Sequence, residues 1–174
     1  NNAVFSGVIK NGIYQSLNAF GSFSNTETAS IQISKNKSNN LETVLISDRS
    51  RPFLSGLSFA NSFSNGKLNF SSERLSKGHS TSKVILNKFY VKKMPVLANL
   101  LSLTSFTGLV DTLQGKGVFF DKSYLEFEKK NGVLTIVDAY GTGDSLGYIL
   151  EGKINADGYV SFAGSLAPAY VLNR

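Results

Sequence analysis

Four Asn-Gly or Asp-Gly pairs recur along the chain, and each leads into residues that alternate between apolar and polar. The pairs are Asn11-Gly12, Asn65-Gly66, Asn131-Gly132 and Asp157-Gly158. Both central residues of a type I′ turn need positive φ, which Asn, Asp and Gly adopt most easily. Such pairs between alternating runs are therefore the strongest short-range indication of a β-hairpin. The spacing predicts a series of hairpins.

The runs beside these pairs alternate with the period of two that is typical of half-buried strands. Leu125 and Phe127, for example, alternate with Glu126 and Glu128. Similar runs occur at Leu68–Phe70, Gly147–Ile154 and Tyr159–Leu166. Weaker alternation is found in the strand-like runs Val4–Ile9, Ile13–Phe23, Thr28–Ser34 and Leu41–Ile46, and Val84–Val91 is predicted to be a longer strand with both faces partly apolar. No crossover helices separate the runs, so the sequence predicts a mainly β fold built as an antiparallel meander.

Two segments interrupt the strands. Pro52 suits the first turn of a short helix near Arg51–Ala60, with Asp48 as its cap. The second is Met94–Leu113, which is too short and too polar to span a membrane. At helical spacing it carries one apolar stripe, which Gly108 can split into two short helices. The stripe consists of Val96, Leu100, Leu103, Val110 and Leu113. This helix either plugs one end of the sheet's apolar face or lies on a membrane surface, and the first alternative is favoured.

The organisation predicted is one β-rich segment over residues 1–174. It divides into N-terminal hairpins (1–47), a short helix with strands (48–93), a helical segment (94–113) and C-terminal hairpins (114–174). Because the chain opens at Asn1 and its single Met is Met94, we expect it to be a piece of a larger protein.

The charge pattern disfavours nucleic acid as a partner. The net charge is +6, but the Lys residues are scattered and Arg is scarce, and aromatic residues do not interleave with the Lys residues. We interpret the Lys residues mainly as solvated strand faces that discourage edge pairing. A basic patch, if formed, would suit anionic lipid headgroups better. The absence of Cys excludes disulfides and thiolate metal sites and is compatible with the periplasm.

No pattern of catalytic or metal-ligating residues emerges. The one histidine, His79, lies in a polar stretch and is expected to be solvated, with no clustered metal ligands. The alternation places Glu126, Glu128, Asp138, Asp144 and Glu151 away from the apolar face or in turns. A carboxyl pair of raised pKa is therefore not expected. The sequence predicts neither an enzyme nor a cofactor.

Taken together, several stretches resemble the AsmA-like superfamily, in particular the C-terminal region of its YhdP-type branch. They are Arg51–Phe70 (RPFLSGLSFANSFSNGKLNF), Met94–Phe120 with its Gly115, Gly117 and Phe120 strand entry, Gly141–Asn155 (GTGDSLGYILEGKIN) and Gly164–Asn173 (GSLAPAYVLN). The similarity covers roughly residues 48–174, while the first 47 residues fit as further hairpins.

The resemblance implies a strongly curved antiparallel meander sheet, a half-pipe with an apolar groove and one or two short amphipathic helices. It implies a periplasmic segment of an inner-membrane-anchored protein of a Gram-negative bacterium. Its partners would be phospholipid acyl chains, neighbouring segments of the same full-length chain and envelope proteins. The candidate groove residues are Leu68, Phe70, Leu125, Phe127, Leu134, Ile136, Tyr148, Leu150, Val160, Phe162 and Leu166.

Three alternatives stay open at this point. The same side chains can close an ordinary core. The apolar face or the sheet edges can bind another envelope protein by strand addition. The weakest alternative is a carbohydrate-active enzyme that uses the surface carboxylates.

Overall fold

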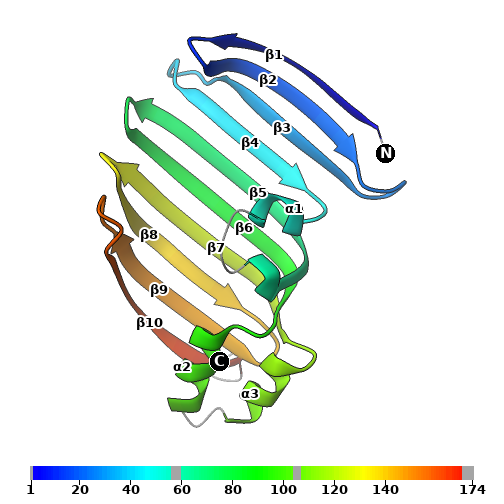
Figure 1. The fold of residues 1–174 in the computed structure, drawn as a ribbon, viewed down its shortest axis with the longest axis vertical. Helices are drawn as coiled ribbons and strands as arrows, with labels where there is room; N and C mark the ends of the chain where they lie inside the picture. Colours follow the sequence, from blue (N-terminus) through cyan, green and yellow to red (C-terminus); the bar gives the residue numbers. More distant parts are fainter. Residues whose placement is uncertain (1, 56–59, 104–106, 170–174) are drawn as a thin grey trace.

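Ten strands form one antiparallel sheet in the computed structural model. The structure describes residues 2–55, 60–103 and 107–169. For residues 60, 96, 100, 103 and 107 it describes only the backbone. The strands follow one another in chain order across the sheet (Figure 1). They are β1 (Ala3–Lys10), β2 (Ile13–Ser22), β3 (Thr28–Lys35), β4 (Leu41–Ser47), β5 (Phe63–Ser76), β6 (His79–Val91), β7 (Val118–Lys130), β8 (Val133–Thr142), β9 (Leu146–Ile154) and β10 (Val160–Pro168). The predicted mainly β antiparallel meander is confirmed, and β1 and β10 are its two edges.

Two of the predicted turns are tight two-residue hairpins. Asn11 and Gly12 join β1 to β2 with φ of 52° and 73°. Asn131 and Gly132 join β7 to β8 with φ of 51° and 85°. Positive φ at both central positions is the requirement of a type I′ turn, so the prediction is confirmed at both places.

The hairpin at Asp157-Gly158 forms, but with a longer loop than predicted. Only Gly158 has positive φ, 86°. The backbone N–H of Asn155 donates to the carbonyl of Tyr159 over 2.8 Å, so five residues connect β9 to β10. The Asp157 carboxylate accepts a hydrogen bond from the Tyr159 N–H, which stabilises this wider loop.

The prediction of a hairpin at Asn65-Gly66 is wrong. Both residues have positive φ, 62° and 91°, yet they lie inside β5, which pairs with β6 on both sides of them. The chain reverses instead at Lys77-Gly78, between β5 and β6. The irregularity has a structural use, because the carbonyls of Asn65 and Gly66 accept hydrogen bonds from the side chain and the backbone N–H of Ser50. These bonds hold the start of helix α1 against β5.

Helix α1 (Arg51–Leu54) begins close to its predicted start, with Pro52 in its first turn. The predicted cap is wrong, because the cap position is Ser50. Asp48 instead accepts a hydrogen bond from the backbone N–H of Thr28 and pairs with Lys67 over 2.8 Å. A short 3-10 helix, η1 (Ala60–Ser62), precedes β5, and residues 56–59 of the predicted helix lie outside the described part.

The predicted helical segment forms two helices, α2 (Pro95–Leu103) and α3 (Thr107–Gln114). They lie together at one end of the sheet (Figure 1). Gly108 does not divide them but lies within α3. Leu101 of α2 and Leu113 of α3 are fully buried in one hydrophobic cluster with residues from β6, β7 and β9. The best-packed part of the molecule is therefore at this end.

Candidate apolar binding face

The pairing register places all eleven predicted groove residues on one face of the sheet. Cross-strand partners share a face, and residues two apart on a strand share it too. One row contains Leu68, Leu86, Ser123, Gly141, Tyr148 and Leu166. The next contains Leu45, Phe70, Val84, Leu125 and Ala139, beside Leu150. Further along are Phe127, Ile136 and Phe162, then Leu134, Ile154 and Val160. We call this surface the apolar face.

The opposite face carries the carboxylates that alternate with these residues. Glu126 pairs with Asp138 across β7 and β8, and its carboxylate lies 3.5 Å from the Lys83 ammonium. Glu151 follows Leu150 on β9 and therefore projects to the same polar side. The sequence interpretation that these acids avoid the apolar face agrees with the register.

A row of aromatic rings crosses the apolar face at the end near α2 and α3. Phe63 stacks on Phe89 with ring centroids 5.6 Å apart, and Phe89 stacks on Phe120 at 5.4 Å. Phe120 then meets Tyr148 edge-on at 5.7 Å. The row runs from β5 to β9 and gives this end a continuous apolar floor.

A cavity of about 650 Å³ opens over this floor. Four predicted groove residues line it, namely Tyr148, Leu150, Phe162 and Leu166. Met94 and Leu97 border it from the side of α2, and Phe89 and Phe120 from the sheet. The volume lies within the range of about 300–1,000 Å³ usual for small-molecule sites.

The predicted groove residues differ in how far they are covered. Leu68 is only 4% exposed and belongs to the core, so it forms no open surface. Phe162 and Val160 near the β10 edge are 50% and 53% exposed, and the other eight are half-buried. The face is thus closed near Leu68 and accessible near β9 and β10.

The predicted helix stripe is described only in part. Leu113 is fully buried, and Val110 packs against the same cluster. The side chains of Val96, Leu100 and Leu103 lie outside the described part of the chain. Leu101, which is not one of these five residues, contributes a fully buried side chain of α2.

Tyr148 contributes a polar group to the floor of the cavity, and a side-chain partner holds it in place. Its hydroxyl lies 2.5 Å from the hydroxyl of Ser123. Burial raises the pKa of the Tyr148 phenol, and the hydrogen bond with Ser123 offsets part of that rise. The phenol therefore stays neutral at physiological pH and disturbs the apolar floor little.

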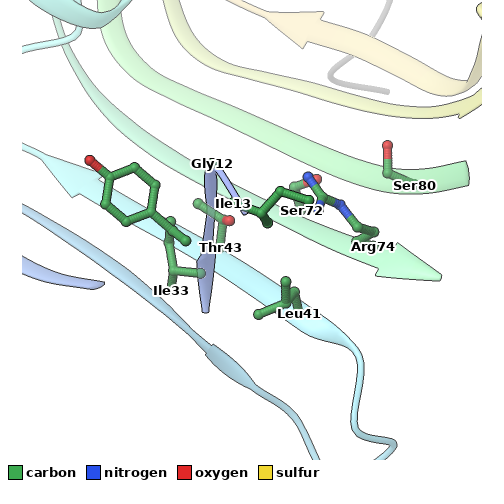
Figure 2. A pocket seen from close by; sticks show the side chains of 9 residues that line it. Gly12, Ile13, Ile33, Leu41, Thr43, Ser72, Arg74 and Ser80 are labelled. Carbon is green, nitrogen blue, oxygen red and sulfur yellow. The ribbon is translucent and has the colours of Figure 1, made fainter. Parts of the chain in front are cut away.

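A second, smaller pocket of about 310 Å³ lies at the other end of the same face, among β2 to β6 (Figure 2). Ile13, Ile33 and Leu41 give it apolar walls. Its polar side chains are those of Tyr14, Thr43, Ser72, Arg74 and Ser80. Figure 2 shows the Arg74 side chain extending toward Ser72 and Ile13. This pocket was not predicted from the sequence, although Phe70, Ser72 and Arg74 alternate with other residues along β5.

His79 is not the solvated residue that was expected. Its Nε2 lies 2.5 Å from Oε1 of Glu128, and its side chain is 22% exposed. Both residues belong to the polar side of the sheet. In the part of the chain that the structure describes, no group of three or more acidic or histidine residues could hold a metal ion.

Comparisons with protein-family models, curated proteins and solved structures found no match to this chain. Among the helices described, none has the length and apolar character needed to cross a membrane. The similarity to the AsmA-like superfamily stays a prediction from the residues quoted above.

Proposed function

We propose that the apolar face is a groove for the acyl chains of phospholipids. The chain would then be a periplasmic segment of an AsmA-like protein of the Gram-negative envelope, anchored in the inner membrane and acting in lipid transport. The observation that carries the proposal is the shared orientation of the eleven groove candidates, four of which line a cavity of about 650 Å³.

The physical requirement for such a site is modest. An acyl chain needs a dry apolar surface and no polar partners, and each methylene removed from water contributes about 0.8 kcal/mol. The aromatic floor from Phe63 to Tyr148 and the half-exposed Phe162 provide apolar contacts on both sides of the cavity. Contiguous exposed apolar surface often marks an interaction site, and the half-exposed Phe162 lines this cavity. A curved sheet, as the resemblance implies, would bring these contacts around the chain.

Site-directed fluorescence tests the proposal directly, because the chain contains no Trp. Phe162→Trp places a single indole on the apolar face, and Phe20→Trp places one on the opposite face. The two Phe residues are matched, being 50% and 54% exposed and on strands at or next to an edge. With phosphatidylcholine brominated on its acyl chains, we expect strong quenching of the Phe162→Trp variant and little quenching of the Phe20→Trp variant.

Equal quenching of both variants would contradict a groove and indicate non-specific contact with lipid. No quenching of either would exclude the groove outright. Circular dichroism of each variant provides the control that the sheet is retained.

A second candidate function is assembly through the sheet edges. Every residue of β1 is exposed, and Val4 and Phe5 are 70% and 79% exposed on opposite faces. An uncovered edge strand offers unpaired backbone groups to another strand. Sedimentation at increasing concentration tests this candidate: Phe5→Lys should abolish association that the unaltered chain shows. A monomer at all concentrations would count against it.

A further inference from the structure

The pocket of Figure 2 differs in chemistry from the rest of the apolar face. Four hydroxyl side chains, those of Tyr14, Thr43, Ser72 and Ser80, line it together with Arg74. Ser72 accepts a hydrogen bond from Ser82 over 2.9 Å and keeps its own proton free to donate. Hydroxyl and guanidinium donors gathered in one pocket are the groups that bind phosphate or carboxylate oxygens.

Arg74 has no acidic partner in the part of the chain that the structure describes. Within the described residues, no carboxylate lies within 4.0 Å of its guanidinium. Glu73 precedes it and projects to the opposite face, where Asn36 and Asn40 donate hydrogen bonds to its carboxylate over 2.6 and 2.8 Å. The nearby acid thus has partners of its own, and the positive charge in the pocket is uncompensated.

Positive charge gathers on this end of the apolar face. The row through Arg74 pairs Lys35 with Leu41, Leu41 with Arg74, Arg74 with Ser80, and Ser80 with Lys129. Lys35 and Lys129 are each two strands from Arg74, about 10 Å away at the usual strand spacing. That separation is comparable to the Debye length of about 10 Å at 0.1 M salt, so screening weakens the field of each Lys at Arg74 without removing it.

The acidic side chains in the row next to Arg74 lie on the opposite face of the sheet. Glu42 pairs with Glu73, and Glu128 pairs with Thr81 in the same row. Glu128 is in contact with His79. At the level of Arg74, Lys35, Arg74 and Lys129 thus lie on the apolar face without an acid among the described residues, whereas the acids lie on the opposite face together with His79 and Lys130.

The distance between this pocket and the apolar core suits an amphiphile. Along β5, Arg74 lies six residues from Leu68, or about 20 Å at the rise of an extended strand. Phe70 lies between them on the same face. One leaflet of a bilayer has tails of about 15 Å, half of its hydrocarbon thickness of about 30 Å. A single tail with its polar end at Arg74 can thus extend over the half-buried Phe70 as far as Leu68, where the face is closed.

We infer that the Arg74 pocket binds the oxyanion of an anionic amphiphile whose tail lies on the apolar face. The ligand class is a phosphate-bearing lipid with net negative charge, in preference to a zwitterionic one. This inference rests on the proposed function, since it names the class of lipid that the groove would hold. Arg74 supplies the bidentate contact, and Lys35 and Lys129 supply the surrounding positive field.

Calorimetric titration with three probes tests the inference. They are dodecyl phosphate, dodecylphosphocholine and inorganic phosphate, each alkyl probe below its micelle concentration. We expect the unaltered chain to bind dodecyl phosphate about tenfold more tightly than dodecylphosphocholine. Arg74→Gln should remove that preference and leave the affinity for dodecylphosphocholine unchanged. Arg51→Gln is the matched control, since Arg51 lies on α1 outside the pocket, and it should keep the preference.

The outcomes separate this inference from the proposed function. Binding of both alkyl probes with equal affinity, unaffected by Arg74→Gln, overturns the headgroup site and leaves the groove. Binding of inorganic phosphate that needs Arg74, without binding of either alkyl probe, leaves a site for free anions and overturns both the amphiphile and the groove. No binding of any probe overturns both as well. Loss of the preference in Arg51→Gln also overturns the site, because overall charge would then explain it.

Discussion

The hydroxyl of Tyr148 on β9 reaches the hydroxyl of Ser123 on β7, 2.5 Å away, across the intervening strand β8. The reach depends on Gly141, the β8 residue that pairs with both. A Cβ at this position would overlap the Tyr148 ring. One glycine thus lets an aromatic ring lie flat over its neighbour and form the floor of the larger cavity.

Gly141→Ala should therefore lower the free energy of unfolding by about 1–3 kcal/mol, the usual cost of adding a methyl group where no space exists. Urea denaturation measures the change. Gly108→Ala is the control, because a Cβ there would meet nothing within 4 Å and alanine favours the helix. A Gly141→Ala variant as stable as the Gly108→Ala variant would contradict the close approach of Tyr148.

We also expect Tyr148 to contribute to a decrease in the free energy of unfolding in alkaline solution. Its pKa is raised in the folded chain, mainly by burial, above the value of about 10 for a free phenol. Above that pH the unfolded chain releases this proton while the folded chain retains it. The folded state then binds more protons, so the free energy of unfolding falls as pH rises.

The fall should begin near pH 10 and be smaller in Tyr148→Phe, which has no phenol proton to lose. Urea denaturation at pH 8 to 11 measures both slopes. Equal slopes in the two proteins would show that Tyr148 titrates alike in both states.

How much of this arrangement the sequence could predict depends on how local each feature is. On β7, Leu125 and Phe127 alternate with Glu126 and Glu128, and strand geometry alone assigns them to opposite faces. The turn at Asn11-Gly12 is equally local, because its two φ angles are properties of the dipeptide.

Features that depend on distant partners could not be predicted in this way. Asn65-Gly66 has the φ angles of a turn, but Phe63 and Ser64 upstream pair with Val91 and Tyr90, so β5 continues through it. The Arg74 pocket likewise needs Ile13 and Leu41, which lie 61 and 33 positions earlier by their numbers in the sequence. A window of adjacent residues contains no information on such pairings.

We expect Glu73 to contribute to a decrease in the free energy of unfolding in acid. Hydrogen bonds from Asn40, the larger effect, and from Asn36 lower the pKa of its carboxyl. A lowered pKa in the folded chain gives stability that is present above the unfolded value of about 4.5 and is lost as pH falls through the folded value.

Glu73→Gln should therefore flatten the dependence of the unfolding free energy on pH between about 5 and 3. Glu151→Gln is the control, since this exposed Glu on β9 has no hydrogen-bond or ion-pair partner among the described residues. An identical pH profile for Glu73→Gln and the unaltered chain would contradict the role of the two Asn side chains.

Truncation of Leu113 tests how firmly helix α3 is attached to the sheet. It is fully buried at the end of α3, in the cluster that includes Phe89 and Phe120. Leu113→Ala should cost about 2–5 kcal/mol, because it removes buried apolar contacts and leaves a cavity. Leu75→Ala, on a residue 40% exposed, should cost far less. Equal midpoints in urea for the two variants would show that α3 is not anchored through Leu113.

Gly66 and Gly158 allow backbone strain to be separated from steric overlap. Their φ angles are nearly equal, 91° and 86°, so alanine at either position pays a similar conformational penalty of about 1–2 kcal/mol. Their surroundings differ, because a Cβ at Gly66 would lie 2.8 Å from Cβ of Phe89, whereas a Cβ at Gly158 would meet nothing within 4 Å.

The free energy of unfolding of Gly66→Ala should therefore be lower than that of Gly158→Ala by about 1–3 kcal/mol, the cost of overpacking. Since Phe89 belongs to the aromatic floor, the same substitution should also weaken binding of an alkyl probe in the larger cavity. Urea denaturation and probe titration on both variants measure the two effects. If Gly158→Ala were as damaging as Gly66→Ala, conformational strain alone would account for both, and Gly66 would have no part in positioning Phe89.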